Sequence, residues 1–125
     1  MVMLGIIVLA SVLASLTDWL CMDLLVHRQY ATAPEIWRRG EGTGRIVISQ
    51  IIGTLATAAT VYLCKELPGR PLLVAGAVWC AGPLPVGLQN LQWMRLRPAV
   101  TVSHAAGWLA RLLMAAYLAA LLLPA

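Results

Sequence analysis

Residues 99–123 read AVTVSHAAGWLARLLMAAYLAALLL, and this stretch decides the fold. Arg111 is its one charged side chain. A helix needs about 20 mostly apolar residues to cross the hydrocarbon core of a bilayer, which is roughly 30 Å thick. The stretch is long enough and apolar enough to do so, and it predicts a transmembrane helix.

Three further apolar runs precede this stretch, from 2 to about 26, from 46 to 64 and from 72 to 93. The first has no basic residue before its apolar core, so we expect a membrane span there rather than a cleaved signal peptide. None of the runs alternates with period two, and an open sheet edge in lipid would leave backbone groups without hydrogen bonds. The sequence therefore predicts an all-α fold, an integral membrane four-helix bundle that forms a single transmembrane domain over 1–125.

The overall composition agrees with a membrane protein. Of the 125 residues, 61% are hydrophobic and 11% are charged, whereas a soluble domain carries about 25% charged residues. The mean hydropathy is +0.83. These values exclude an ordinary soluble enzyme, a disordered tail and a secreted disulfide scaffold. The three cysteines lie in apolar stretches without a CxxC or Cys–His cluster, so we expect no metal site.

The net charge of +4 does not indicate nucleic-acid binding, because all basic residues except Arg111 lie between the apolar runs, as topology signals do. Loop two, between the second and third runs, holds Lys65 and Arg70. Loop one joins the first and second runs, and loop three joins the third and fourth. Both lie on the opposite side of the membrane from loop two and are richer in arginine. We therefore expect these two loops in the cytoplasm and both termini outside. The arginines of loops one and three are Arg28, Arg38, Arg39, Arg45, Arg95 and Arg97.

Loop one contains a second helix signal. The residues Thr32-Ala33-Pro34-Glu35 have the form of a capping box, which marks the start of a helix. We expect a short amphipathic helix on the membrane surface, with Trp37, Arg38 and Arg39 contacting lipid headgroups.

Polar side chains inside the apolar runs are the candidate functional residues, because such groups are costly in lipid. Under the expected topology they all fall in the cytoplasmic half of the bundle. Arg111 requires a carboxylate, and Asp18 is the acidic residue closest to it in depth. This pair either fixes the packing of the first and last spans or handles a proton or a substrate; the remaining alternative is that each side chain extends to water separately. The candidate cluster is Asp18, Asp23, Gln50, Gln89, Asn90, His104 and Arg111.

The third run is interrupted by Gly82-Pro83-Leu84-Pro85-Val86-Gly87. Each proline removes a backbone donor and disfavours helical geometry in the residue before it. We expect this helix to be kinked at Pro83 and Pro85. Such a kink either serves packing alone or, as in many transporters, frees backbone groups to bind a ligand.

Small residues recur at four-residue spacing in the first, second and fourth runs, and such faces allow helices to approach closely. The pairs are Ala10 and Ala14, Ser11 and Ser15, Gly53 and Thr57, Ala115 and Ala119, and Ala116 and Ala120. We expect contact with lipids and with a second copy or a larger membrane complex. No catalytic constellation is present, and we expect neither enzymatic activity nor a cofactor. The favoured function is a non-enzymatic accessory or structural subunit, and the alternative is a small transporter or channel with a polar pocket facing the cytoplasm.

Several scattered features resemble the DUF1761 family of small bacterial and fungal integral membrane proteins. They are Asp18-Trp19, Tyr30, Pro34-Glu35-Ile36-Trp37, Trp79 with Pro83, and Ser103-His104-Ala105-Ala106-Gly107-Trp108. The resemblance implies a four-span membrane fold and no assigned activity. We accordingly expect a multi-pass protein of the bacterial cytoplasmic (inner) membrane.

Overall fold

The computed structural model describes residues 1–21, 43–95 and 97–123, and within these residues all regular structure is helical. The helices are α1 (Val2–Cys21), α3 (Thr43–Glu66), α4 (Pro71–Ala81), α5 (Pro83–Trp93) and α6 (Pro98–Leu122). The predicted all-α class is confirmed.

Four candidate membrane spans emerge from these helices. They cover Val2–Leu20, Ile46–Glu66, Pro71–Trp93 and Pro98–Leu122, the third being made of α4 and α5 together. The last three agree with the predicted runs to within about two residues. The chain is therefore a multi-pass membrane protein. Some of the predictions fall on residues outside the described ones. They are the end of the first run near residue 26, the surface helix in loop one, and the roles of Asp23, Trp37, Arg38 and Arg39.

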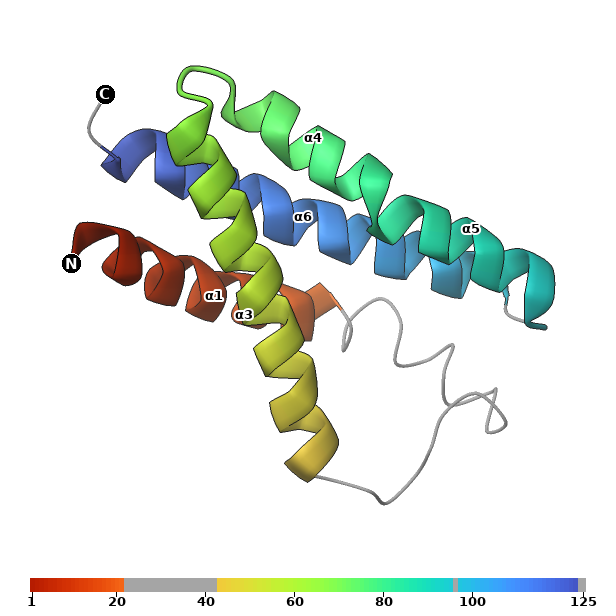
Figure 1. The fold of residues 1–125 in the computed structure, drawn as a ribbon. Helices are drawn as coiled ribbons and strands as arrows, with labels where there is room; N and C mark the ends of the chain where they lie inside the picture. The colour runs from red at the N-terminus through yellow and green to blue at the C-terminus, as the bar shows by residue number, and fades with distance from the viewer. Residues whose placement is uncertain (22–42, 96, 124–125) are drawn as a thin grey trace.

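The helix α6 is the centre of the bundle, because it packs against α1, α3, α4 and α5. Figure 1 shows α1 and the α4–α5 pair running along α6, while α3 crosses the other helices. Both termini lie at the same end of the bundle, as an even number of crossings requires (Figure 1).

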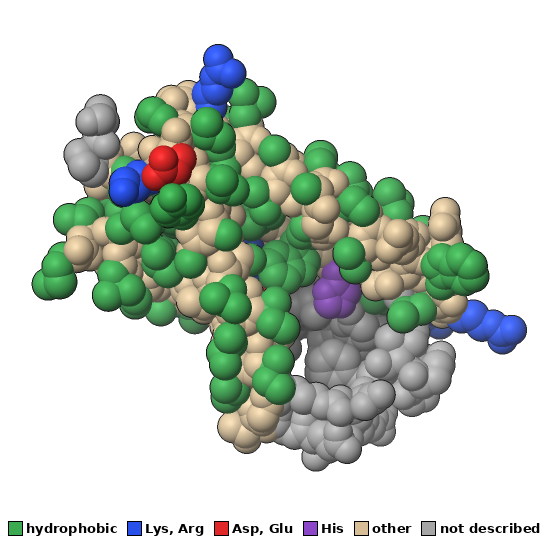
Figure 2. All heavy atoms as spheres, viewed as in Figure 1, with side chains coloured by type: hydrophobic (Ala, Val, Ile, Leu, Met, Phe, Trp, Pro, Cys, Tyr) green, Lys and Arg blue, Asp and Glu red, His purple; other side chains and the backbone are tan. Residues whose placement is uncertain are grey.

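Small side chains make up much of the core between these helices. Ala10 and Ala14 of α1 and Thr57 of α3 are fully buried. Three alanines of α6, Ala115, Ala116 and Ala119, are buried as well. Packing within the chain thus uses most of the small-residue faces that the sequence suggested for contacts with partners. Many large apolar side chains of every helix are exposed. Hydrophobic side chains, drawn in green, cover much of the face seen in Figure 2, as expected for a surface in contact with lipid.

The third span is broken at Gly82, whose φ of −124° and ψ of −82° are not helical. Pro83 and Pro85 both fall in the first turn of α5, where a missing N–H leaves no helical hydrogen bond unmade. At the end of α4, in contrast, the carbonyls of Trp79 and Ala81 receive no hydrogen bond from residues 83 and 85, because a proline has no N–H. The predicted kink is confirmed, and the non-helical residue is the one before the first proline.

The two halves of this span meet α6 through different contacts. On α4, the indole Nε1–H of Trp79 donates a 2.8 Å hydrogen bond to the carbonyl of Ala105. On α5, Gly87 faces Thr101, whose Cγ2 would lie 3.4 Å from a Cβ at that glycine. The broken span thus packs against the central helix on both sides of Gly82.

Candidate functional site

Arg111 lies in the middle of α6 and is only 5% exposed. Its Nη2 lies 3.7 Å from Oδ2 of Asp18, which is near the end of α1. The predicted pairing of these two residues is confirmed. The Asp18 side chain is 44% exposed, so the pair joins a buried cation to a half-exposed anion.

Two glycines make room for this ion pair. A Cβ placed on Gly53 of α3 would lie 2.7 Å from Cζ and 3.1 Å from Nη2 of Arg111. A Cβ placed on Gly107 of α6 would lie 3.1 Å from Oδ1 of Asp18. The guanidinium therefore rests directly on the α3 backbone, and the carboxylate rests on α6. Sequence reasoning placed Gly53 only in a small-residue face, because nothing along the chain shows what lies opposite it.

The guanidinium has one further neighbour of note. Its Cζ lies 5.7 Å from the ring centroid of Trp108, within the range of a cation–π interaction. Its Nη1 is buried and has no hydrogen-bond partner within the described part of the chain. Among the described residues, Arg111 thus has the Asp18 carboxylate and the Trp108 ring as its electrostatic partners, and the loss of either would leave its charge less well compensated in an apolar region.

His104, Trp108 and Arg111 follow i, i+4, i+7 spacing and therefore share one face of α6. His104 and Trp108 line a cavity of about 320 Å³ between α5 and α6. Asp18 lies close enough for its carboxylate to act electrostatically on the His104 imidazole. The ion pair and the cavity are therefore neighbours that share one face of the central helix.

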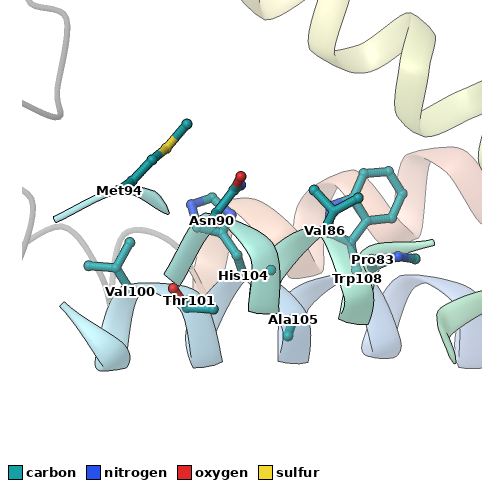
Figure 3. Close-up of a pocket in the computed structure, with 10 residues that line it drawn as sticks. Pro83, Val86, Asn90, Met94, Val100, Thr101, His104, Ala105 and Trp108 are labelled. Atoms are coloured by element: carbon teal, nitrogen blue, oxygen red, sulfur yellow. The ribbon is translucent and has the colours of Figure 1, made fainter. Parts of the chain in front are cut away.

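Side chains from both helices line this α5–α6 cavity, as Figure 3 shows. Asn90 reaches in from α5, and Thr101 and His104 reach in from α6. The remaining wall is mostly apolar and includes Pro83, the first residue after the break, and Val86. The cavity thus has one polar group of side chains in an otherwise apolar lining.

The other predicted members of the polar cluster lie elsewhere. Gln50 accepts a 2.6 Å hydrogen bond from the Ser15 hydroxyl and lines a groove between α1 and α3. Gln89 is exposed on α5 and is not among the described residues that line the α5–α6 cavity. The structure therefore gathers Asp18, His104 and Arg111 around the cavity with Asn90, and leaves the two glutamines outside this group.

Sequence reasoning did not single out Thr101, which is 9% exposed and whose Oγ1 has no hydrogen-bond partner among the residues that the structure describes. The hydroxyl of a helical threonine usually donates a hydrogen bond to a backbone carbonyl of its own helix, so the residue type alone does not indicate an unpaired hydroxyl. Across residues 1–21, 43–95 and 97–123, no group of three or more His, Cys, Asp or Glu side chains could hold a metal ion.

Comparisons with known proteins give no relative for this chain. No protein-family model, no curated protein and no solved structure matches it. The resemblance to the DUF1761 family stays a prediction.

Proposed function

We propose that this multi-pass protein is a non-enzymatic accessory or structural subunit that acts through contacts inside the bilayer, either with a second copy of itself or with a larger membrane complex. The observation that carries the proposal is the exposure of the first half of α3.

The helix α3 changes its environment at Gly53. Every residue from 46 to 52 is exposed, whereas Gly53, Thr57 and Thr60 are buried against the other helices. Figure 2 shows the first half projecting from the bundle, with apolar side chains along both of its visible sides. Ser49 and Gln50 lie in this same exposed half. Polar groups on a span favour contact with another helix over contact with lipid tails.

The groove between α1 and α3 continues this surface. Ser11, Ser15 and Gln50 line it, together with the apolar side chains of Val12 and Leu16. The hydroxyl of Ser11 is buried and lacks a hydrogen-bond partner among the residues described. Small residues let a neighbouring backbone approach closely, and their hydroxyl groups can bond across helices. These features suit a partner helix that carries small or polar residues.

Photo-crosslinking from α3 tests this proposal. A benzophenone amino acid replaces Ile48 in the exposed half of α3, and the control carries it at Leu72 of α4, since the two residues are similarly exposed at 59% and 65%. Irradiation of native membranes should give a discrete protein adduct from position 48, and mass spectrometry then identifies it. A monomer in detergent-free nanodiscs, with only lipid adducts from both positions, would contradict the proposal.

A second candidate function is transport, and the α5–α6 cavity beside the broken span favours it. Discontinuous helices form substrate sites in many transporters because the break frees backbone groups. Asp18 and His104 next to the cavity are groups that can exchange protons. Proteoliposomes loaded with the pH dye pyranine measure this directly. A proton flux that is lost in Asp18→Asn supports transport. A flux no greater than that of empty liposomes contradicts proton transport by this protein.

We further propose the bacterial cytoplasmic membrane as the location, with both termini outside. The greater number of arginines in loops one and three supports this orientation.

A further inference from the structure

Gln50 is the starting point, because it is an exposed polar side chain on the half of α3 that projects from the bundle. It lies four residues after Ile46, where the span begins, which is roughly 6 Å along the helix axis. Its Oε1 accepts a 2.6 Å hydrogen bond from the Ser15 hydroxyl of α1. A carboxamide oxygen can accept two hydrogen bonds and its nitrogen can donate two, so Ser15 uses one part of this capacity. Lipid tails offer no partner for the rest.

The residues around Gln50 form a continuous stripe along α3. Val47, Gln50, Ile51 and Thr54 follow i, i+3, i+4, i+7 spacing and therefore share one face of the helix; we call them the Gln50 stripe. The stripe is part of a shallow hollow of about 360 Å³ whose described lining residues all belong to α3. These lining residues are Ile46, Val47, Gln50, Ile51, Thr54 and Leu55.

An apolar helix face with one amide in it is a typical helix–helix contact. In coiled coils a single amide on such a face fixes the register and the number of strands, because it must meet another polar group. In a bilayer the same group favours association, because a hydrogen bond across helices replaces an unsatisfied group in lipid. The partner of the Gln50 stripe is therefore expected to present a polar group at the depth of Gln50.

A second copy of the chain presents such a group by symmetry. Copies inserted with the same orientation are related by an axis along the membrane normal, so each residue lies at the same depth in both. A two-fold axis brings the same surface of each copy together, and Gln50 near that axis meets Gln50 of the other copy. A carboxamide is donor and acceptor at once. Each Nε2–H can therefore donate to Oε1 of the other copy, while that oxygen keeps its bond from Ser15.

We propose that a second copy of this chain packs against the Gln50 stripe across a two-fold axis normal to the membrane, with the two Gln50 carboxamides hydrogen-bonded to each other. Val47 and Ile51, which are 51% and 53% exposed, pack against the same residues of the other copy. This inference rests on the proposed function, contact inside the bilayer, and names the partner.

Disulfide crosslinking in native membranes tests where the copies meet. The background has Cys21, Cys64 and Cys80 replaced by alanine. Val47→Cys places a thiol on the stripe, and Ile52→Cys is the matched control, because Val47 and Ile52 are 51% and 53% exposed. The two positions lie about 140° apart around the helix. Oxidation with copper phenanthroline should link Val47→Cys into a homodimer and leave Ile52→Cys mostly monomeric. Equal yields from the two positions, or no homodimer from Val47→Cys, would overturn the inference.

Energy transfer between donor- and acceptor-labelled copies, diluted in liposomes, measures the role of the amide. Gln50→Leu removes both reciprocal hydrogen bonds and should weaken the dimer about five- to ten-fold, since one such bond between membrane helices contributes a factor of roughly three. Gln89→Leu is the control, because Gln89 is an exposed glutamine of α5 outside the stripe, and it should associate as the wild type does. Circular dichroism checks that each variant is folded. Association of Gln50→Leu as strong as that of the wild type would contradict the proposed pairing.

The photo-crosslinker at Ile48 separates this inference from the proposed function. Adducts with a different protein, together with no homodimer from Val47→Cys, would overturn the inference and leave the proposed function in place. Lipid adducts alone, together with a monomeric chain in nanodiscs, would contradict both.

Discussion

Replacing Gly53 with alanine adds one methyl group to α3, and we expect that group to destabilise the protein. In an open helix the same change is stabilising by about 0.5–1 kcal/mol, because alanine loses less conformational freedom on folding. At Gly53 the new Cβ would lie 2.7 Å from Cζ of Arg111, well inside van der Waals contact. The guanidinium must therefore move away from the position in which it pairs with Asp18.

The cost follows from the geometry of the ion pair. At 3.7 Å, an effective dielectric constant of about 20 gives an attraction of roughly 4.5 kcal/mol between unit charges. Asp18 is 44% exposed, and screening reduces the value to about 2–3 kcal/mol. Overpacking adds about 1–3 kcal/mol, and the helix preference of alanine offsets up to about 1 kcal/mol. We expect Gly53→Ala to lower the free energy of unfolding by roughly 2–6 kcal/mol.

Reversible unfolding in bicelles, followed by circular dichroism, measures this change. The matched control is Gly76→Ala on α4, where a Cβ would meet nothing within 4 Å and the free energy of unfolding should stay the same or rise. A second arm places Gly53→Ala in an Arg111→Leu background, where the clash with the guanidinium is absent and most of the penalty should disappear. Our reasoning is wrong if Gly53→Ala is as stable as the wild type, or if its penalty is equal in both backgrounds.

Three other outcomes follow from features described above. Asp18→Asn should destabilise the protein by about 2–3 kcal/mol, because it leaves Arg111 buried without the charge of its partner. Replacing both residues with apolar ones should recover most of this loss. A coupling energy below about 0.5 kcal/mol in the double-mutant cycle would contradict the pairing. Trp79→Phe removes the hydrogen bond to the Ala105 carbonyl and should cost about 1 kcal/mol in the same unfolding assay, whereas an unchanged stability would count against that bond. In a cysteine-free background, Thr43→Cys should resist a membrane-impermeant maleimide in intact cells and react after lysis; labelling of intact cells would reverse the proposed topology.

The spans, the break and the ion pair could be predicted because each follows from a local cost. Long apolar runs require lipid, Pro83 cannot donate a backbone hydrogen bond, and Arg111 cannot remain unpaired at its depth. Few carboxylates lie within the apolar runs, and Asp18 is the one nearest to Arg111 in depth. These predictions needed no knowledge of how the helices are rotated about their axes.

The rest of the site depends on that rotation. Gln89 and Asn90 are adjacent in the sequence, yet the first is exposed and the second lines the cavity, because successive residues of a helix point about 100° apart and the rotation of α5 decides which of them faces α6. Gly53 acquires its role only from the guanidinium that lies opposite it. Pairings across helices of this kind are not encoded in the spacing of residues along one helix.

The central position of α6 has a consequence for how the protein is made. A ribosome synthesises α6 after the helices that surround it, so the earlier spans enter the membrane before their common packing partner exists. Arg111 then has to cross into the bilayer at a moment when Asp18 is already present to receive its charge. Insertion of the last span and assembly of the bundle are thereby coupled, and a ribosome that stalls before α6 leaves the earlier spans without a core.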